Sequence, residues 1–215
     1  MTARAAHPPS FNSRHLFIGA VWLSGCLAAF STAMRYDFNP GRLGPPLIRW
    51  PEGTALTRTP GRETVVAFLH PRCVCTRASV TQLVRTLQRA PQADLIVSVF
   101  VPPAEPAADR PAWETGEYVQ AVRQDLPQAR VVFDEGGVEA RRFGALTSGT
   151  MLVYSGDGRE VFRGGITNRR GGEDDNPGLR RFARAVTDAE TAGATKSSPV
   201  FGCPLIPSDA AHGRR

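Results

Sequence analysis

The sequence predicts an α/β domain built in three layers and preceded by one hydrophobic helix. Short runs of β-branched and apolar residues, typical of strands buried on both faces, alternate with segments whose apolar residues recur at helical spacing. The alternation ends in a hairpin and a last helix. The resulting order, β-α-β-α-β-(α)-β-β-α, is typical of an α/β three-layer domain, here over about residues 63–190.

Local patterns predict each element of this domain. Buried strands are expected at residues 64–69 (TVVAFL) and 94–101 (DLIVSVFV). The helix between them ends before Pro91, and its apolar side chains lie at positions i, i+3, i+4 and i+7, namely Val80, Leu83, Val84 and Leu87. The remaining expected elements are a helix near 114–124, a strand at 130–133, a short helix around 138–143, a hairpin over 150–164 that turns at 155–158, and a helix near 179–187.

Length and composition exclude several classes of protein. The 215 residues suffice for one globular domain with appendages, and 21 Gly and 18 Pro fall short of the content of collagen or low-complexity chains. The net charge is +6, but residues 1–35 carry three Arg and no acidic residue, so the remainder is nearly balanced. Lys196 is the only Lys, and this excess of Arg is typical of a coding bias. We therefore expect no nucleic-acid partner.

The N-terminal segment is long and apolar enough to cross a membrane. Residues 16–34 contain no charge, and as a helix they would span about 28 Å of a hydrocarbon core that is about 30 Å thick. Arg4 and Arg14 precede this run, whereas Arg35 and Asp37 follow it and nearly cancel. By the positive-inside rule the N-terminus lies in the cytoplasm and the rest of the chain in the periplasm or outside the cell. We expect a single-pass protein of the inner (cytoplasmic) membrane.

Two alternatives to an uncleaved anchor stay open. One is cleavage after Ala33, and the other is lipidation of Cys26, because residues 23–26 (LSGC) resemble a lipoprotein box. We favour the anchor because the apolar run exceeds the about 7–15 residues typical of a signal-peptide hydrophobic region. All three interpretations export the rest of the chain.

The chain is expected to have five parts. They are a cytoplasmic N-terminus (1–15), a transmembrane anchor (16–35), a Pro/Gly-rich linker (36–62), the folded domain (63–190) and a C-terminal tail (191–215). The large apolar side chains of the linker are expected to pack on the domain, since a fully solvated linker has little use for them; they are Leu47, Ile48 and Trp50.

Two cysteines lie between the first strand and its helix. In the sequence HPRCVCT (residues 70–76), Cys73 and Cys75 stand where the C-terminal end of a strand meets the N-terminus of a helix, a usual place for sites in α/β sheets. Free helix amides favour a thiolate there, and Arg72 and Arg77 add positive charge. We expect a redox-active Cys73, with a structural disulfide or a pair of idle thiols as the alternative.

The pattern as a whole resembles the thioredoxin-like superfamily, above all its exported, membrane-anchored thiol-disulfide members. The strand, the cysteine-containing turn, the helix, an Ala-x-x-Phe-Gly segment and the Asp-Gly hairpin follow one another in the family's order. More narrowly, HPRCVCT, SGT before a strand and VFGCPL near the C-terminus resemble bacterial RedB-type thioredoxin-like proteins. The resemblance covers about residues 36–206. It implies a thioredoxin-like fold and thiol-disulfide chemistry at Cys73.

Two departures from the family pattern affect the site. The motif is C-x-C rather than C-x-x-C, so Cys73 matches the nucleophile, Cys75 lies between the two usual positions, and Thr76 stands where the second cysteine would be. Cys73 and Cys75 can form a disulfide only if Cys73 lies outside the helix. The second departure is Gly149, followed by Thr150, at the position of the family's cis-proline, which normally faces the nucleophile.

Other candidates lie close in sequence or in the tail. His70 would serve as a base, as a soft-metal ligand, or only as a loop imidazole. Cys203 sits in an apolar cluster that is expected to dock on the domain; it would resolve a disulfide of Cys73 or Cys75, complete a thiolate metal site, or stay unbonded. The charged loop over residues 164–178 either forms a lip over the site or is a solvated surface loop.

Two functions of different class follow. In the first, the protein is an extracytoplasmic thiol-disulfide oxidoreductase without a cofactor. It acts on protein thiols or disulfides through attack by Cys73 and resolution by Cys75 or Cys203, and its accessory residues are His70, Arg72, Thr76, Gly149 and Thr150. In the second, it is a non-catalytic module that binds Cu(I) or zinc through His70, Cys73 and Cys75, or a partner protein. The first is favoured because the sequence has no second C-x-C, no His-x-His and only three Met.

Overall fold

The computed structural model describes residues 13–103, 109–188 and 195–206. It divides into two compact units, Met1–Asp37 and Phe38–Arg215, which are taken separately below.

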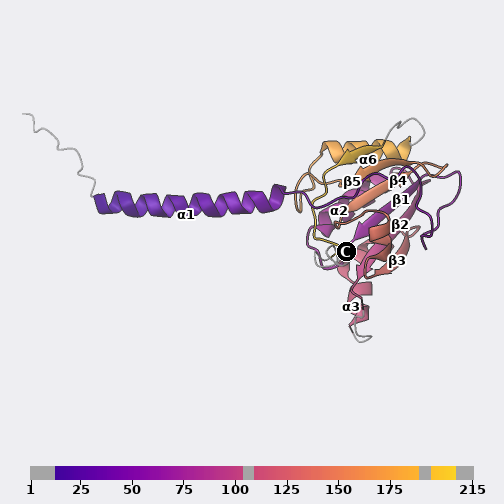
Figure 1. The fold of residues 1–215 in the computed structure, drawn as a ribbon, viewed down its shortest axis with the longest axis horizontal. Coiled ribbons are helices and arrows are strands. Elements are labelled where there is room, and N and C mark those ends of the chain that lie inside the picture. The colour runs from indigo at the N-terminus through magenta and orange to yellow at the C-terminus, as the bar shows by residue number, and fades with distance from the viewer. Residues whose placement is uncertain (1–12, 104–108, 189–194, 207–215) are drawn as a thin grey trace, which may run out of the picture. The chain divides into compact units, whose positions relative to one another are not determined.

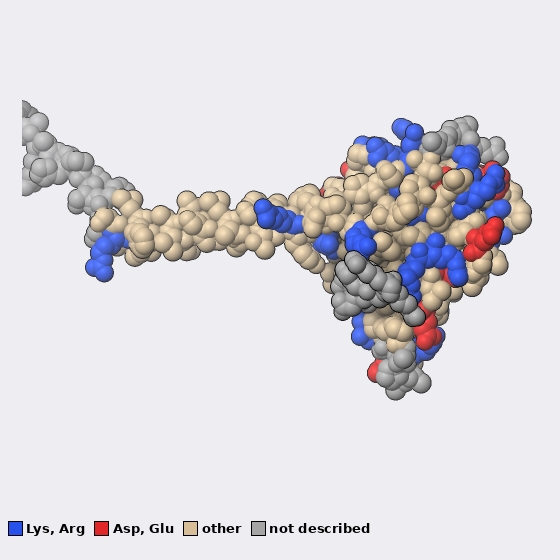
Figure 2. Space-filling view, viewed as in Figure 1, with Lys and Arg blue, Asp and Glu red and all other residues tan. Residues whose placement is uncertain are grey.

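The first unit is the helix α1 (Ser13–Phe38), none of whose residues is buried. Its length and its mean hydropathy of 1.7 are sufficient to cross a membrane. Figure 2 shows that charged side chains are confined to the two ends of this helix. The helix therefore has the character of a membrane anchor or of a signal sequence, as its composition predicts.

The second unit is built on one mixed sheet of six strands in the order β3-β2-β1-β4-β5-β6 (Figure 1). β1 is parallel to β2, β2 is parallel to β3, and β5 is parallel to β6, whereas β4 runs antiparallel to both of its neighbours, β1 and β5. The strands are β1 (Thr64–Leu69), β2 (Asp94–Val101), β3 (Arg130–Glu135), β4 (Thr150–Tyr154), β5 (Glu160–Gly164) and β6 (Lys196–Ser198).

Alternation of side chains along the strands creates two cores, one on each face of the sheet. Val65, Ala67 and Leu69 of β1 pack with the apolar faces of the longer helices, which are α2 (Thr76–Leu87), α4 (Glu117–Asp125) and α6 (Pro177–Thr187). Val66 and Phe68 face the other core, which is covered by α5 (Val138–Arg142), the short α3 (Arg110–Glu114), and parts of the linker and the C-terminal segment. This is the expected three-layer α/β arrangement, and its fold is thioredoxin-like.

The expected elements are present with small shifts at their ends. α2 begins at Thr76, directly after the cysteines, as the sequence predicts, whereas the helix expected near 114–124 is two helices, α3 and α4. β6 was not expected, because its sequence Lys196–Ser198 has no apolar alternation and it pairs only at the edge of the sheet with β5.

The linker packs on the domain, against the core that contains Val66 and Phe68. The indole ring of Trp50 lies edge-on to the rings of Phe143 and Tyr154, with centroids 5.1 and 4.9 Å away. The expectation that Ile48 packs was wrong, because its side chain is 84% exposed. Only its backbone is used: the carbonyl oxygen of Ile48 accepts the N–H of Glu160 at 3.3 Å.

A buried ion pair ties the linker to β5. Both the Arg163 and Glu160 side chains are almost fully buried, with the Arg163 Nε 2.9 Å from one Glu160 carboxylate oxygen. The same guanidinium donates to the carbonyl oxygen of Phe143 at 2.9 Å, and the Glu160 carboxylate accepts the N–H of Leu47 at 3.3 Å. One charged pair thereby satisfies backbone groups from two segments that carry no regular secondary structure.

Replacing Arg163 by Met is expected to destabilise the domain by about 3–5 kcal/mol, because it leaves the Glu160 carboxylate buried without a cation. Urea denaturation followed by tryptophan fluorescence measures this loss. The double variant Arg163→Met/Glu160→Gln removes the buried charge as well and should recover part of the stability. Equal stability of Arg163→Met and the unaltered chain would contradict this account of the pair.

Candidate functional site

Cys73 and Cys75 lie at the carboxyl end of β1, the central strand, in the turn that leads into α2. The turn is closed by two backbone hydrogen bonds, from the Cys73 N–H to the His70 carbonyl oxygen (3.1 Å) and from the Thr76 N–H to the Cys73 carbonyl oxygen (2.9 Å). α2 starts at Thr76 with Cys75 as its N-cap, so Cys73 lies outside the helix. This meets the geometric condition for a disulfide between the two cysteines of the C-x-C motif.

The C-terminal segment brings Cys203 to the same place. The Ser148 N–H donates to the Cys203 carbonyl oxygen at 2.8 Å, and the Leu205 N–H donates to the Leu146 carbonyl oxygen at 3.0 Å. Gly202 fits tightly, since a β-carbon there would overlap the carbonyl oxygen of Ser148. The segment therefore lies antiparallel to the loop that precedes β4 and covers the site.

Three thiols meet at this point, with Cys73 at the centre. Burial alone would raise the pKa of the Cys73 thiol, but hydrogen bonds from the Cys203 S–H, from the N–H groups of Cys203 and Cys75, and from the Thr76 hydroxyl outweigh it and lower this pKa. Arg72 and Arg77, which the sequence suggested for this role, are not among the main contributors. Cys73 is 1% exposed, and all four cysteines of the chain are free thiols.

The pKa values of the two neighbouring thiols, Cys75 and Cys203, are raised rather than lowered. Burial, followed by donation of its S–H to Cys73, raises the pKa of Cys203 to about 12. Burial and the charge of Cys73 also raise the pKa of Cys75, although a hydrogen bond from Arg170 opposes this. The arrangement thus favours one thiolate, at Cys73, and two protonated thiols that donate to it.

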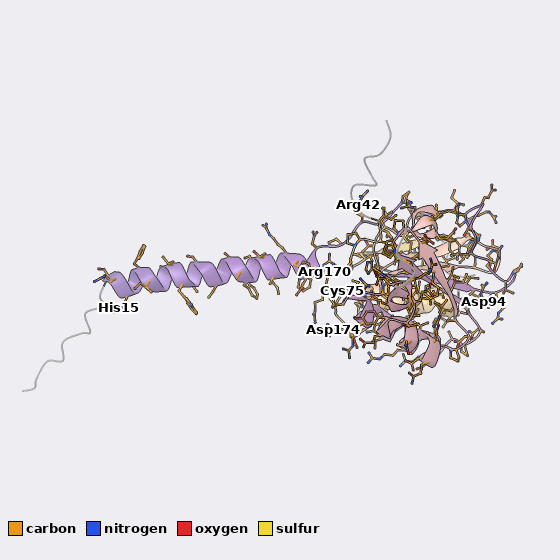
Figure 3. All side chains as sticks on the ribbon, turned by 90° about the horizontal axis from the view of Figure 1, so that it is seen from below. His15, Arg42, Cys75, Asp94, Arg170 and Asp174 are labelled. Carbon is orange, nitrogen blue, oxygen red and sulfur yellow. The ribbon has the colours of Figure 1, made fainter. Side chains whose placement is uncertain are left out.

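Arg170 is the one residue of the 164–178 loop whose contacts with the thiols are seen in the described part of the chain. Arg170 lies beside Cys75 (Figure 3). Its guanidinium also donates to the Gly202 carbonyl oxygen at 2.5 Å. Other charged side chains of the loop pair nearby instead: Arg169 with Asp174, and Asp175 with Arg180. Asn176 caps α6 by accepting the Leu179 N–H. Among the described contacts, the loop thus reaches the thiols through Arg170.

His70 and Arg72, which lie just before the cysteines in the chain, pack against aromatic side chains. The His70 ring stacks on Phe100 with centroids 5.4 Å apart, and its Nδ1 accepts the N–H of Arg72 at 3.2 Å. Burial lowers the pKa of this imidazole and so favours its neutral form. The Arg72 guanidinium lies 4.0 Å above the centroid of the Trp113 ring. Neither side chain appears among the main groups that act on Cys73.

The remaining accessory residues shape the loop before β4. Gly149 has φ of +87°, a conformation that favours glycine, and its N–H donates to the Phe68 carbonyl oxygen at 2.8 Å. The described residues contain no cis peptide bond. The Thr150 hydroxyl donates to the Thr147 carbonyl oxygen at 2.6 Å, which closes the loop rather than reaching the thiols.

Ser148 was missed by the sequence analysis. Its hydroxyl lies 2.9 Å from the Thr76 hydroxyl and accepts the His70 N–H at 2.9 Å, while its own N–H holds Cys203. Ser148 therefore joins all three segments of the site. The SGT motif was the available signal, but nothing in it distinguishes this serine from a turn residue.

The alternative metal site gains no support from the geometry. No group of three or more His, Cys, Asp or Glu side chains among the described residues is arranged to hold a metal ion. The Nδ1 of His70 is already engaged by the Arg72 N–H. Binding of Cu(I) or zinc through His70, Cys73 and Cys75 thus stays a prediction from sequence.

Comparisons with known proteins show the fold and leave the function open. No protein-family model and no curated protein matches the chain. Among solved structures, an uncharacterised conserved protein from Geobacillus kaustophilus is 17% identical with a TM-score of 0.54, covering 79% of this chain and 93% of its own. A hypothetical protein from Sinorhizobium meliloti 1021 is 20% identical with a TM-score of 0.52, covering 79% and 96%. A thioredoxin-like protein from Aeropyrum pernix is 14% identical with a TM-score of 0.41, covering 79% and 99%.

Docking of the C-terminal segment is expected to limit access to Cys73. In Gly202→Ala the added β-carbon displaces the segment from Ser148, and alkylation of Cys73 should accelerate by roughly tenfold, which corresponds to about 1.4 kcal/mol of docking free energy. The rates are compared by peptide mass mapping at a pH where Cys73 is ionised in both proteins. Gly116→Ala is the matched control, because its β-carbon would lie 3.6 Å from Pro71, an ordinary contact. Equal rates in all three proteins would show that the segment does not cover the thiol.

Proposed function

We propose that the chain is a membrane-anchored thiol-disulfide oxidoreductase that acts on the extracytoplasmic face with Cys73 as its nucleophile. The observation that carries the proposal is the set of donors around Cys73: two protonated thiols and two backbone N–H groups donate to its sulfur, and these hydrogen bonds lower its pKa. The thiolate is the reactive form of cysteine, and hydrogen-bond donors stabilise it at neutral pH. A purely structural thiol would need no such set of donors.

The exchange follows from the positions of the three sulfurs. The Cys73 thiolate attacks one sulfur of a substrate disulfide, a new S–S bond forms, and the second substrate sulfur leaves as a thiolate. Cys203 then loses its proton to solvent and attacks the Cys73 sulfur. The substrate sulfur that was bound to Cys73 now leaves as a thiolate. The substrate disulfide has then been reduced by two electrons, and a Cys73–Cys203 disulfide remains. The reverse sequence oxidises a substrate dithiol.

Cys203 is the better resolving residue of the two neighbours. It lies on a separate segment that can approach Cys73 as a unit, whereas Cys75 is only two residues away and fixed at the N-cap of α2. Cys203 is also partly exposed, while Cys75 is 4% exposed. A protein substrate reaches Cys73 when the C-terminal segment moves off the loop before β4.

The location and the partners belong to the same proposal. An N-terminal helix able to span a membrane, with Arg14 in its first turn, supports an inner-membrane anchor with the domain in the periplasm. The thioredoxin-like fold supports a protein thiol or disulfide as the substrate. The resemblance of HPRCVCT, SGT and VFGCPL to RedB-type proteins agrees with an exported bacterial thioredoxin-like protein.

Single cysteine substitutions separate the roles. Cys73→Ser is expected to lose disulfide exchange almost completely, by roughly a thousandfold or more, because the attacking thiolate is gone. Cys203→Ser should keep the first attack and accumulate a mixed disulfide between Cys73 and substrate, which is detected by intact mass. Cys75→Ser is the comparison that should still turn over. Full exchange activity in Cys73→Ser would refute the proposed nucleophile.

The pH dependence tests the origin of the thiolate. Thiolate absorbance should rise as the pH passes the pKa of Cys73, with a midpoint below the about 8.5 of an ordinary thiol, and Cys73→Ser supplies the background. Cys203→Ala removes one donor and should move the midpoint upward by roughly one unit. Cys203→Ser keeps a donor and should move it less. A midpoint unchanged in Cys203→Ala would mean that this thiol does not stabilise the thiolate.

A further inference from the structure

A cavity of about 420 Å³ opens beside the C-terminal segment, outside the cluster of thiols. Its size falls in the range of small-molecule sites. Three arginines from different parts of the domain line it: Arg42 from the linker, Arg141 from α5 and Arg170 from the 164–178 loop. Among the residues that the structure describes, no Asp or Glu lines this cavity. The cavity is therefore a concentration of positive charge in a domain whose charges are otherwise nearly balanced.

Two of the three arginines of the cavity, Arg42 and Arg141, are available to a ligand. Arg42 and Arg141 are exposed, and neither forms an ion pair with any residue that the structure describes. The sequence neighbour of Arg141 differs in this respect, because Arg142 pairs with Glu139, and in the 164–178 loop Arg169 pairs with Asp174. Two guanidinium groups without carboxylate partners at the mouth of one cavity are suited to bind carboxylates, whose geometry matches the planar donor fork of Arg.

The cavity adjoins the thiols directly. Gly202 and Pro204, which precede and follow Cys203 in the chain, form part of the cavity wall. The Cα atom of Cys203 is therefore about 3.8 Å from the Cα atom of each of these lining residues. Arg170 lies between the two regions, since it lines the cavity, donates to the Gly202 carbonyl oxygen and forms a hydrogen bond with the Cys75 sulfur. A group bound in the cavity is thus one residue away from the proposed resolving cysteine.

We propose that this cavity recognises carboxylate groups next to the reacting sulfur of the substrate, and so makes the enzyme selective for anionic thiols and disulfides. The proposal rests on the oxidoreductase function proposed above and uses the same exchange steps. The substrate class is a cysteine with neighbouring carboxylates, supplied either by a small peptide such as glutathione or by acidic residues around a cysteine of a protein. Arg42 and Arg141 are specificity-determining residues in this scheme, and Arg170 joins the cavity to the thiols.

The test compares three small disulfides as oxidants of the reduced full-length protein in zwitterionic micelles: glutathione disulfide (anionic), hydroxyethyl disulfide (neutral) and cystamine (cationic). The unaltered protein should favour glutathione disulfide over the neutral compound, each rate being divided by the rate of the same disulfide with a free thiol. Arg42→Gln/Arg141→Gln should lower this preference about five- to tenfold and leave the rate with hydroxyethyl disulfide unchanged. Raising the salt from about 0.01 M to about 1 M should reduce the preference in the unaltered protein, because it shortens the screening length.

The control removes two positive charges elsewhere. Arg89→Gln/Arg184→Gln changes two exposed arginines that do not line the cavity and should retain the preference. A matched pair of cysteine peptides, one flanked by Glu and one by Gln, shows whether a peptide gives the same selectivity as glutathione; selectivity for either anionic source supports the proposal.

Three results separate the possible failures. Exchange with all three disulfides at equal relative rates would overturn the charge selectivity and leave the oxidoreductase function standing. No exchange with any of them would overturn the oxidoreductase function itself. If Arg42→Gln/Arg141→Gln keeps its substrate preference but loses binding to vesicles of anionic lipid, the arginines serve the membrane surface and the substrate proposal is wrong.

Discussion

The central position of β1 is the constraint on which the rest of the domain depends. All six residues of this strand are buried, it pairs with β2 on one side and β4 on the other, and its two faces serve two separate cores. A strand enclosed on every side has a fixed register and direction, because a shift by one residue would exchange the side chains of the two cores. Cys73 lies only four residues beyond Leu69, the last residue of β1, so the position of the C-x-C motif is set by this strand.

The site is built from two parts, the turn between β1 and α2 and the C-terminal segment that packs on the loop before β4. Cys73 and Cys75 are held by the turn between β1 and α2, whereas Cys203 arrives on a segment fixed by hydrogen bonds to the loop before β4. Segments held by a few backbone hydrogen bonds open at a lower free energy than core strands do. The site thus has two sulfurs on the rigid turn, Cys73 and Cys75, and a third, Cys203, on a segment held by few backbone hydrogen bonds. Such an arrangement is suited to a reaction in which a disulfide forms and breaks.

Sequence patterns predicted strands β1 to β5 and the position of Cys73 and Cys75 after β1, because these features depend on short-range regularities. Strands at residues 64–69 and 94–101 follow from local apolar runs, and the position of Cys73 follows from its place after a strand. The contacts of Ser148, Arg170 and Cys203 join segments that are far apart in the sequence, such as Ser148 with His70 and Cys203 with Cys73, and no periodicity encodes such contacts. Ile48 shows the opposite failure: its hydrophobicity predicted burial, but the linker uses its backbone there and turns the side chain outward.

The near-complete burial of Cys73 has a chemical consequence in an oxidising compartment. Peroxides convert an accessible thiolate to sulfenic acid and then to the sulfinic and sulfonic acids, which are not readily reduced again. Low thiol pKa speeds the first of these steps, so the feature that would make Cys73 useful also makes it vulnerable. Under the proposed function, the C-terminal segment would limit the access of small oxidants to this sulfur, and the two adjacent thiols would convert a sulfenic acid to a disulfide before further oxidation. The segment that would delay the substrate would then also protect the proposed nucleophile.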